Sequence, residues 1–126
     1  MDKPTLIILD QEFSIHRFQP SASLPASIFN SQFYWLGKTD EELSVVCDSS
    51  IELNSDQKSE GWSCIKVLGP LDLSMTGVLA GISAVLAAAQ ISIFALSTFD
   101  TDFILVKTTL VEKAVIALRE AGYNLE

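Results

Sequence analysis

Two short polar segments hold side chains that could recognise a small molecule. Asp72, Ser74 and Thr76 lie just before a long apolar run, and Asp100 and Asp102 lie in a second segment further along the chain. Carboxylates accept hydrogen bonds from an ammonium group, and hydroxyls can donate to a carboxylate. The two segments therefore predict a site for a small molecule that carries such groups.

The predicted start of the apolar helix adds hydrogen-bond donors to this site. Backbone N–H groups in the first turn of a helix have no partner within the helix and can hold a carboxylate. Phe99 could cover an aliphatic or cationic part of the ligand. Each residue also has a purely structural interpretation, and the sequence leaves both open: Ser74 as a helix N-cap, Asp100 and Asp102 as turn formers, Leu71 and Met75 as core residues.

The sequence lacks the residue patterns that are typical of an active site. His16 is the single histidine, and its alternating surroundings favour a packed or surface side chain. There is no Ser/His/Asp order and no phosphate-binding loop pattern. Asp100 and Asp102 are a weak hint of a metal, because no other ligand type lies nearby in sequence. We therefore expect no catalytic residue, no metal and no cofactor.

Residues 61–126 carry the pattern of a β-α-β-β-α-β unit. A strand is predicted over residues 62–68, and an apolar stripe at helical spacing predicts a helix over residues 75–89. Strands over residues 91–98 and 103–107 flank a turn at residues 99–102. A capping box from Thr109 to Glu112 predicts the start of a second helix, Gly122 its end, and residues 123–125 a final strand. This order is the ferredoxin-like arrangement.

Residues 1–60 show a weaker version of the same plan. Strands are predicted over residues 5–9 and 13–18, joined by a hairpin turn or a bulge at residues 10–12. A short helix is expected within residues 21–29, strands over 33–36 and 43–47, and a polar loop over 51–60. We infer an α+β fold of two ferredoxin-like units in tandem, with antiparallel sheets and helices on one face. The predicted domains are residues 1–60, as a degenerate unit, and residues 61–126.

The predicted long helix has a second stripe of very small residues, Gly77, Gly81, Ala84 and Ala88. Glycine in a helix interior costs about 1 kcal/mol relative to alanine. Close packing against another helix, in this chain or in a partner, would explain that cost. An ordinary buried helix that tolerates small residues is the alternative.

Composition limits the class of partner and the compartment. The chain has 16 Asp and Glu against 8 Lys and Arg and shows no basic stripe, which argues against nucleic-acid binding. Cys47 and Cys64 lie in apolar, strand-like segments, so buried free thiols in a reducing compartment are expected over a disulfide. The N-terminus lacks the features of a signal peptide, so the cytoplasm is the expected location.

The uncharged run over residues 78–96 is long enough to span a bilayer. Gln90 interrupts this run, and the pattern changes there from helical to alternating. No Lys or Arg lies close to the start of the run. These features favour a buried helix followed by a strand, and we expect no membrane association.

The second half of the chain resembles an ACT domain. The resemblance rests on residues 67–72 (VLGPLD), 77–80 (GVLA), 89–93 (AQISI) and 97–106 (STFDTDFILV), and it covers roughly residues 62–121. The sequence is most similar to the small tandem ACT proteins of bacteria, and also to the ACT modules of aspartate kinases and to cytosolic arginine sensors. Residues 1–60 match only in general layout.

The resemblance implies regulatory binding of a small molecule, usually an amino acid, between the loop after the first strand and an edge of a neighbouring ACT unit. In this sequence that loop is residues 69–76, and in sensor-like members the segment at residues 97–102 also faces the ligand. Arginine-binding relatives place an acid near the start of the long helix, where this chain has Met75. The predicted ligand-binding residues are Gly69, Leu71, Asp72, Ser74, Met75, Thr76, Thr98, Phe99, Asp100 and Asp102.

Two functions are therefore in competition. The first is a non-catalytic regulatory or sensor protein that binds a small molecule and forms a homodimer or another homo-oligomer. Such a protein passes its signal to a separate effector protein or acts as a stand-alone sensor or buffer. The second is a structural or protein-interaction module that assembles through sheet edges and helices without a small ligand. We expect the first.

Overall fold

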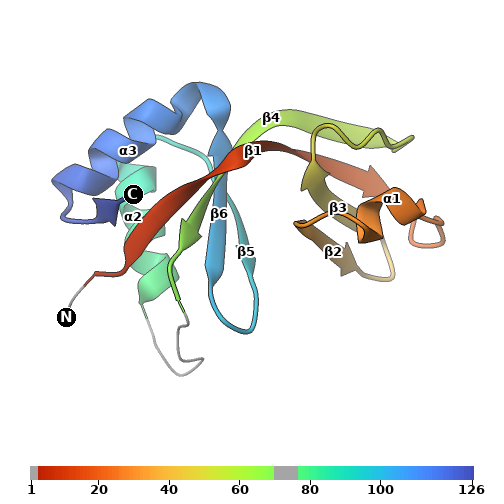
Figure 1. Cartoon of the computed structure of the whole chain (residues 1–126), viewed down its shortest axis with the longest axis horizontal. Coiled ribbons are helices and arrows are strands. Elements are labelled where there is room, and N and C mark those ends of the chain that lie inside the picture. Colours follow the sequence, from red (N-terminus) through yellow and green to blue (C-terminus); the bar gives the residue numbers. More distant parts are fainter. Residues whose placement is uncertain (1–2, 70–76) are drawn as a thin grey trace. The chain divides into compact units, whose positions relative to one another are not determined.

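The computed structural model describes residues 3–69 and 77–126, and the chain divides into two compact units. Unit 1 comprises residues 1–10 and 63–126, and unit 2 comprises residues 11–62. Two strands, β1 (Thr5–Phe18) and β4 (Gln57–Val67), contribute residues to both units (Figure 1). The strand order is β2-β3-β1-β4-β6-β5, and β7 (Asn124–Leu125) pairs with β1.

Unit 1 follows the order predicted for residues 61–126. After β4 come α2 (Val78–Ala88), β5 (Phe94–Ser97), β6 (Asp102–Lys107), the short 3-10 turn η1 (Thr108–Leu110), α3 (Val111–Glu120) and β7. The order β-α-β-β-α-β is therefore confirmed. The strand β7 runs parallel to the start of β1, with Thr5 opposite Asn124 and Leu6 opposite Leu125.

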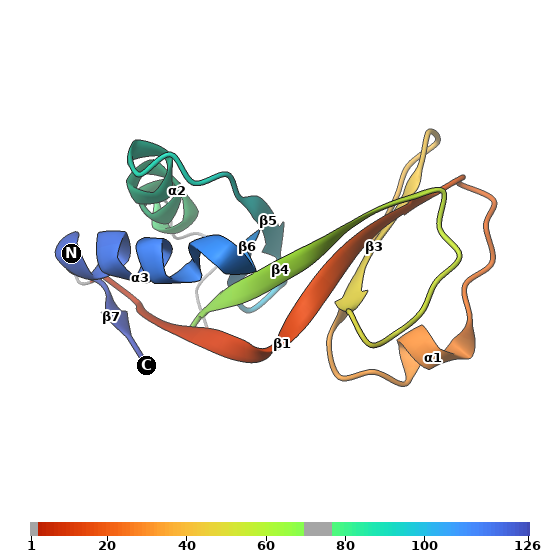
Figure 2. The same ribbon diagram turned by 90° about the horizontal axis from the view of Figure 1, so that it is seen from above.

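The core of unit 1 lies between the two helices and one face of the strands. Ile82 and Leu86, one helical turn apart on α2, and Leu118 on α3 are fully buried. They belong to one cluster with Ile65 of β4 and Ile104 of β6. Figure 2 shows α2 and α3 on the same side of the unit 1 strands. The apolar stripes therefore face the core of unit 1, as predicted. Each buried Leu or Ile contributes about 1.5–3 kcal/mol to the stability of the folded state.

Of the two residues predicted to mark the ends of α3, one is confirmed and one is not. Gly122 has φ +98° just after α3, which confirms it as the residue that ends the helix. The capping box at Thr109 is wrong, because Thr109 lies within η1 and α3 has no side-chain cap.

The small-residue stripe has an explanation within unit 1. A Cβ atom at Gly81 would lie 2.9 Å from the hydroxyl of Tyr123, so this glycine makes room for a side chain and not for another helix. Gly77 precedes the helix as its N-cap, with φ +82°, and Ala84 and Ala88 are exposed.

Unit 2 is built around the second half of β1. Residues 13–18 pair with β3 (Leu43–Asp48), which pairs on its other side with β2 (Tyr34–Lys38), both antiparallel. The helix α1 (Ala26–Phe29) follows Pro25 and buries Ile28 against Phe18, Val45 and other residues of the unit core. The hairpin turn is wrong as an interpretation of residues 10–12, because β1 runs through these residues as one strand.

The cysteines and the apolar run can now be placed. Cys47 and Cys64 are free thiols and buried, and burial raises the pKa of Cys47 to about 11 and that of Cys64 to about 12. Both therefore remain protonated at neutral pH. The helix formed by the apolar run ends at Ala88. No helix within residues 3–69 and 77–126 could cross a membrane.

Candidate functional site

The turn between β5 and β6 is held in shape by its two threonines. Ser97 pairs with Asp102 at the end of the two strands. The N–H of Thr98 donates to the carbonyl of Thr101 at 2.8 Å, and the N–H of Thr101 donates to Oγ1 of Thr98 at 3.3 Å. Thr98, one of the predicted ligand residues, therefore serves at least to close the turn.

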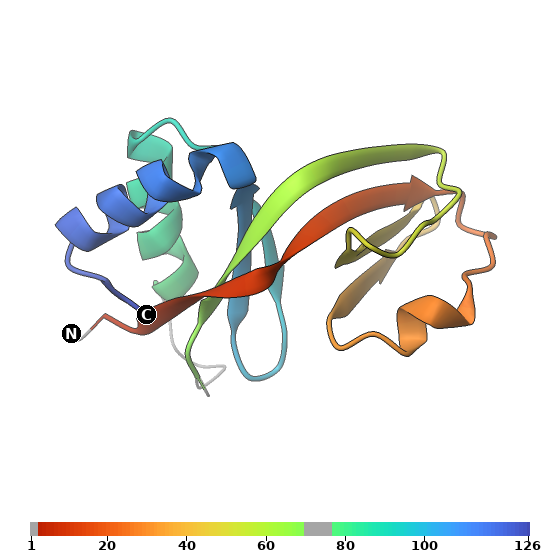
Figure 3. The same cartoon turned by 45° about the horizontal axis from the view of Figure 1, so that its top comes forward.

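Thr101 fastens this turn to the end of β4. Its buried hydroxyl donates to the carbonyl of Val67 at 2.6 Å. The N–H of the next residue, Leu68, donates to the carbonyl of Thr5 at 2.9 Å. Gly69, the first residue of the predicted binding loop, therefore lies two residues after Val67, to which the β5–β6 turn is hydrogen-bonded. Figure 3 shows this turn and the end of β4 at the same edge of unit 1.

The turn presents an aromatic ring and two carboxylates. Phe99 is 77% exposed, which is unusual for a large apolar side chain, and Asp100 is exposed beside it. Asp102 is partly buried and accepts a hydrogen bond from the hydroxyl of Ser97 at 2.6 Å. These groups suit an ammonium group and the carbon atoms next to it.

The start of α2 supplies the donors that a ligand carboxylate would need. The helix begins at Val78 with Gly77 as N-cap, and within residues 3–69 and 77–126 no side chain caps its first N–H groups. No acidic residue lies in its first turn, where a carboxylate would repel an anion. Five of the predicted ligand residues, Leu71, Asp72, Ser74, Met75 and Thr76, lie outside the described residues. The structure thus groups Gly69, Thr98, Phe99, Asp100 and Asp102 around one edge of unit 1.

A polar pocket in unit 2 was not predicted from the sequence. His16, interpreted as a packed or surface residue, is buried and lines this pocket together with Ser14, Lys58 and Glu60. The one sequence signal is the alternation along β1, which places Ser14 and His16 on the same face of the strand. Nothing local predicts the residues that approach from positions 49–60. Within the described residues, no group of three or more His, Cys, Asp or Glu side chains could hold a metal ion.

Two models of known protein families match parts of the chain. A family model described as an ACT domain matches residues 57–120. A second model, which describes an N-terminal domain, matches residues 11–51. A search of curated proteins gives no match.

Solved structures with the same fold cover nearly the whole chain. A protein of Agrobacterium tumefaciens is 34% identical, with a TM-score of 0.90, over 100% of this chain and 94% of its own. The ligand-free regulatory subunit of aspartate kinase from Thermus thermophilus is 12% identical, with a TM-score of 0.66, over 96% of this chain and 99% of its own.

A complete enzyme also contains this fold. The aspartate kinase of Clostridium acetobutylicum, described as an allosteric enzyme, is 14% identical, with a TM-score of 0.67, over 89% of this chain and 33% of its own. The two kinase structures show likeness of fold, whereas the ACT domain model covers residues 57–120, just over half of the 126 residues. From its sequence match and its β-α-β-β-α-β unit, this chain belongs to the ACT domain family.

Proposed function

We propose that the protein is a non-catalytic regulatory protein that binds a small molecule of the amino-acid class. The ligand contacts the residues that follow β4, the first turn of α2 and the β5–β6 turn. The hydrogen bond from Thr101 to the carbonyl of Val67 carries this proposal, because it ties two of these three segments together. In this arrangement the first N–H groups of α2 hold the ligand carboxylate, and Asp102 and Asp100 face its ammonium group.

We further infer that both units are of the ACT type, arranged in tandem, with residues 1–60 holding the degenerate member and residues 61–126 holding most of the other. The supporting observation is that unit 2 repeats part of the order of unit 1. It has a strand, a short helix and two antiparallel strands, but a loop where unit 1 has α3. The protein acts by changing its contacts with a separate effector, as a homodimer or larger homo-oligomer.

Thermal unfolding with each of the twenty amino acids tests this function. A ligand at a hundredfold excess over its Kd stabilises the folded state by about 2.7 kcal/mol. We expect a selective rise in Tm with one amino acid or a few related ones. Asp102→Ala should abolish the rise that binding in unit 1 produces, while leaving the Tm of the free protein nearly unchanged, because the carboxylate is near the surface. Asp40→Ala, in an exposed turn of unit 2, is the matched control and should keep the full response.

A second candidate function is an assembly module without a small ligand. It is favoured by the exposed apolar side chains of Phe29, Tyr34 and Leu36, since β2 lies at one end of the strand order. The same experiment at two protein concentrations separates the two functions. A flat amino-acid panel combined with a Tm that rises with protein concentration would replace the sensor by the assembly module.

A further inference from the structure

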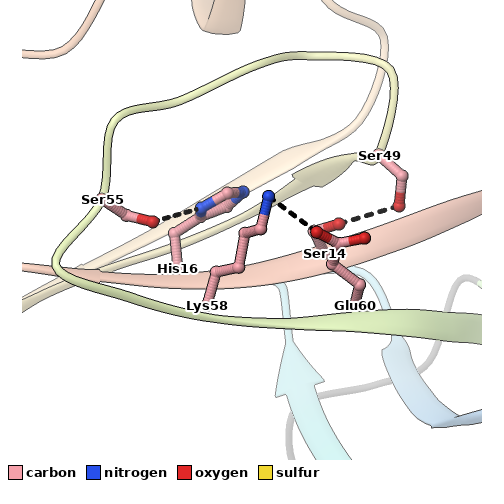
Figure 4. Close-up of polar contacts among 6 residues, drawn as sticks. All are labelled: Ser14, His16, Ser49, Ser55, Lys58 and Glu60. Atoms are coloured by element: carbon pink, nitrogen blue, oxygen red, sulfur yellow. Dashed lines mark hydrogen bonds and ion pairs between the residues drawn. The ribbon is translucent and has the colours of Figure 1, made fainter.

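A polar pocket of about 420 Å³ is lined only by residues of unit 2 and shares no residue with the site proposed above. Its volume is in the range of small-molecule sites, roughly 300–1,000 Å³. It is lined by Ser14 and His16 of β1, Lys58 and Glu60 of β4, and residues of the connecting loop, Ser49, Ile51, Glu52 and Leu53. Figure 4 shows the side chains of His16, Lys58 and Glu60 directed toward a common space beneath the loop that carries Ser49 and Ser55.

The base of the pocket contains a buried nitrogen without a hydrogen bond. His16 is only 3% exposed, and its Nδ1 is 2.9 Å from the hydroxyl of Ser55. Its Nε2 is buried and has no hydrogen-bond partner among the described residues. An unpaired buried polar atom costs about 1–3 kcal/mol, so such atoms are rare in folded proteins. A polar group that reaches this nitrogen from the pocket would give it a partner.

Hydroxyl groups complete the polar base. The hydroxyls of Ser14 and Ser49 lie 2.8 Å apart, and Ser14 is only 3% exposed. Each hydroxyl can donate one hydrogen bond and accept others. The base can therefore bind an uncharged group that both donates and accepts, such as an amide or a hydroxyl.

The mouth of the pocket is charged. Nζ of Lys58 is 2.6 Å from Oε1 of Glu60, and both side chains are about half exposed. Glu52 is a third charged group at the pocket. Burial and the charge of Lys58 lower the pKa of His16, so the imidazole is neutral near pH 7. One cation and two carboxylates favour a ligand that carries both signs, because a simple anion would meet net negative charge.

We propose that this pocket is a second small-molecule site, which binds a zwitterion with a short, polar and uncharged tail. The ligand carboxylate contacts Lys58, its ammonium group contacts Glu60 and Glu52, and its tail contacts Nε2 of His16 and the hydroxyls of Ser14 and Ser49. The ammonium group of Lys58 has three N–H donors, and Glu60 occupies one of them. The inference concerns unit 2 alone and does not depend on the proposed site in unit 1.

The single histidine of the chain makes a direct test possible. The probes are glutamine, asparagine, serine and threonine, each titrated into uniformly 15N-labelled full-length protein, with leucine as the apolar comparison. A long-range 1H–15N spectrum reports the two ring nitrogens of His16 and no others. We expect a saturable shift of Nε2 with at least one polar amino acid and none with leucine. If none of the four polar probes moves Nε2, the proposal is wrong.

Two variants and a control establish the contacts. Lys58→Met and Glu60→Gln should each raise the Kd by about tenfold, the loss of roughly 1.4 kcal/mol. Lys38→Met, which removes another exposed lysine of unit 2, should leave the Kd unchanged. An unchanged Kd in Lys58→Met would contradict the proposed pose. Both side chains are about half exposed, so these variants should fold.

Asp102→Ala separates this site from the one in unit 1. The shift of Nε2 should persist in this variant with an unchanged Kd. Loss of the shift in Asp102→Ala would place the ligand in unit 1 and overturn the second site. Conversely, a shift of His16 without any response of residues 97–102 would support this pocket and remove support from the proposed site in unit 1.

Discussion

At the scale of single residues, the position of the β5–β6 turn depends on one hydroxyl. Thr101→Val keeps the shape of the side chain and removes the donor to the carbonyl of Val67. Because both groups are buried, we expect a loss of about 1–3 kcal/mol in the free energy of unfolding. Urea denaturation with constant m-value measures this loss.

An exposed threonine gives the matched comparison. Thr109→Val makes the same chemical change in η1, where the side chain is exposed, and should leave the stability within about 0.5 kcal/mol of the wild type. Equal losses in the two variants would show that the hydrogen bond of Thr101 is not what matters. Thr101→Val should also weaken any amino-acid response of unit 1, since the turn is then no longer fixed to the end of β4.

His16 makes the stability of the protein depend on pH. Burial and the nearby Lys58 lower the pKa of its imidazole, while Glu60 raises it less; Glu52 also lines the pocket. Below about pH 6.5 the unfolded chain takes up a proton that the folded chain still resists. The free energy of unfolding should therefore fall as the pH falls through 6.5 and toward the lowered pKa of the folded state.

NMR titration of the imidazole checks this prediction, because His16 has no other histidine signal to overlap it. We expect a midpoint below 6.5 in the folded protein. His16→Gln should show a smaller loss of stability between pH 7 and pH 5 than the wild type. A midpoint at or above 6.5 would mean that the carboxylates outweigh burial and Lys58.

At the scale of elements, α3 needs a glycine to end where it does. Gly122 has φ +98°, and its neighbours carry the chain into β7, whose pairing with β1 completes unit 1. A side chain at this φ is strained, so Gly122→Ala should destabilise the protein by about 1 kcal/mol or more. Gly37→Ala in β2 is the control, since its φ is not positive and its Cβ would meet nothing within 4 Å. Thermal unfolding of both variants provides the comparison.

Local pattern was sufficient for most elements of unit 1 and failed where partners are distant in sequence. The stripes of α2 and α3 and the order of strands in residues 61–126 follow from spacing alone. The polar residues Asp10 and Glu12 suggested a turn, yet both are exposed positions in a continuous strand. That strand pairs with β7 at one end and with β3 further along, and no local pattern encodes these contacts.

The two candidate sites also differ in how far local sequence pattern predicts them. The β5–β6 turn was predictable because its residues are consecutive, and Gly69 lies two residues after Val67, the end of the strand that Thr101 contacts. The hydrogen bond itself joins residues 34 positions apart and was not predicted. The pocket around His16 combines β1, a loop without regular structure and β4, so only the alternation of Ser14 and His16 was visible in the sequence.

At the scale of the whole molecule, unit 1 combines the first ten residues of the chain with the last sixty-four. Leu6 of β1 is fully buried in the core with Leu118 and Leu125. Unit 1 therefore requires both ends of the chain, and unit 2 is formed by the segment between them. Contacts of such large sequence separation slow folding, because the intervening chain must be ordered or looped out first.

Assembly of whole molecules is expected to use the free edge of β2. This strand lies at one end of the strand order, and it exposes 43% of Leu36 and 36% of Tyr34, with Phe29 against the Tyr34 ring at 5.6 Å. An exposed apolar edge favours pairing with another chain, and a lysine at such an edge opposes it. Leu36→Lys should therefore shift the protein toward the monomer in sedimentation equilibrium, with Tm no longer rising with protein concentration. Ile116→Lys changes an equally apolar, 58% exposed residue on α3 and should leave the association unchanged. If Ile116→Lys alone dissociates the protein, the helices of unit 1 form the interface; if neither variant does, the β2 edge is not the contact.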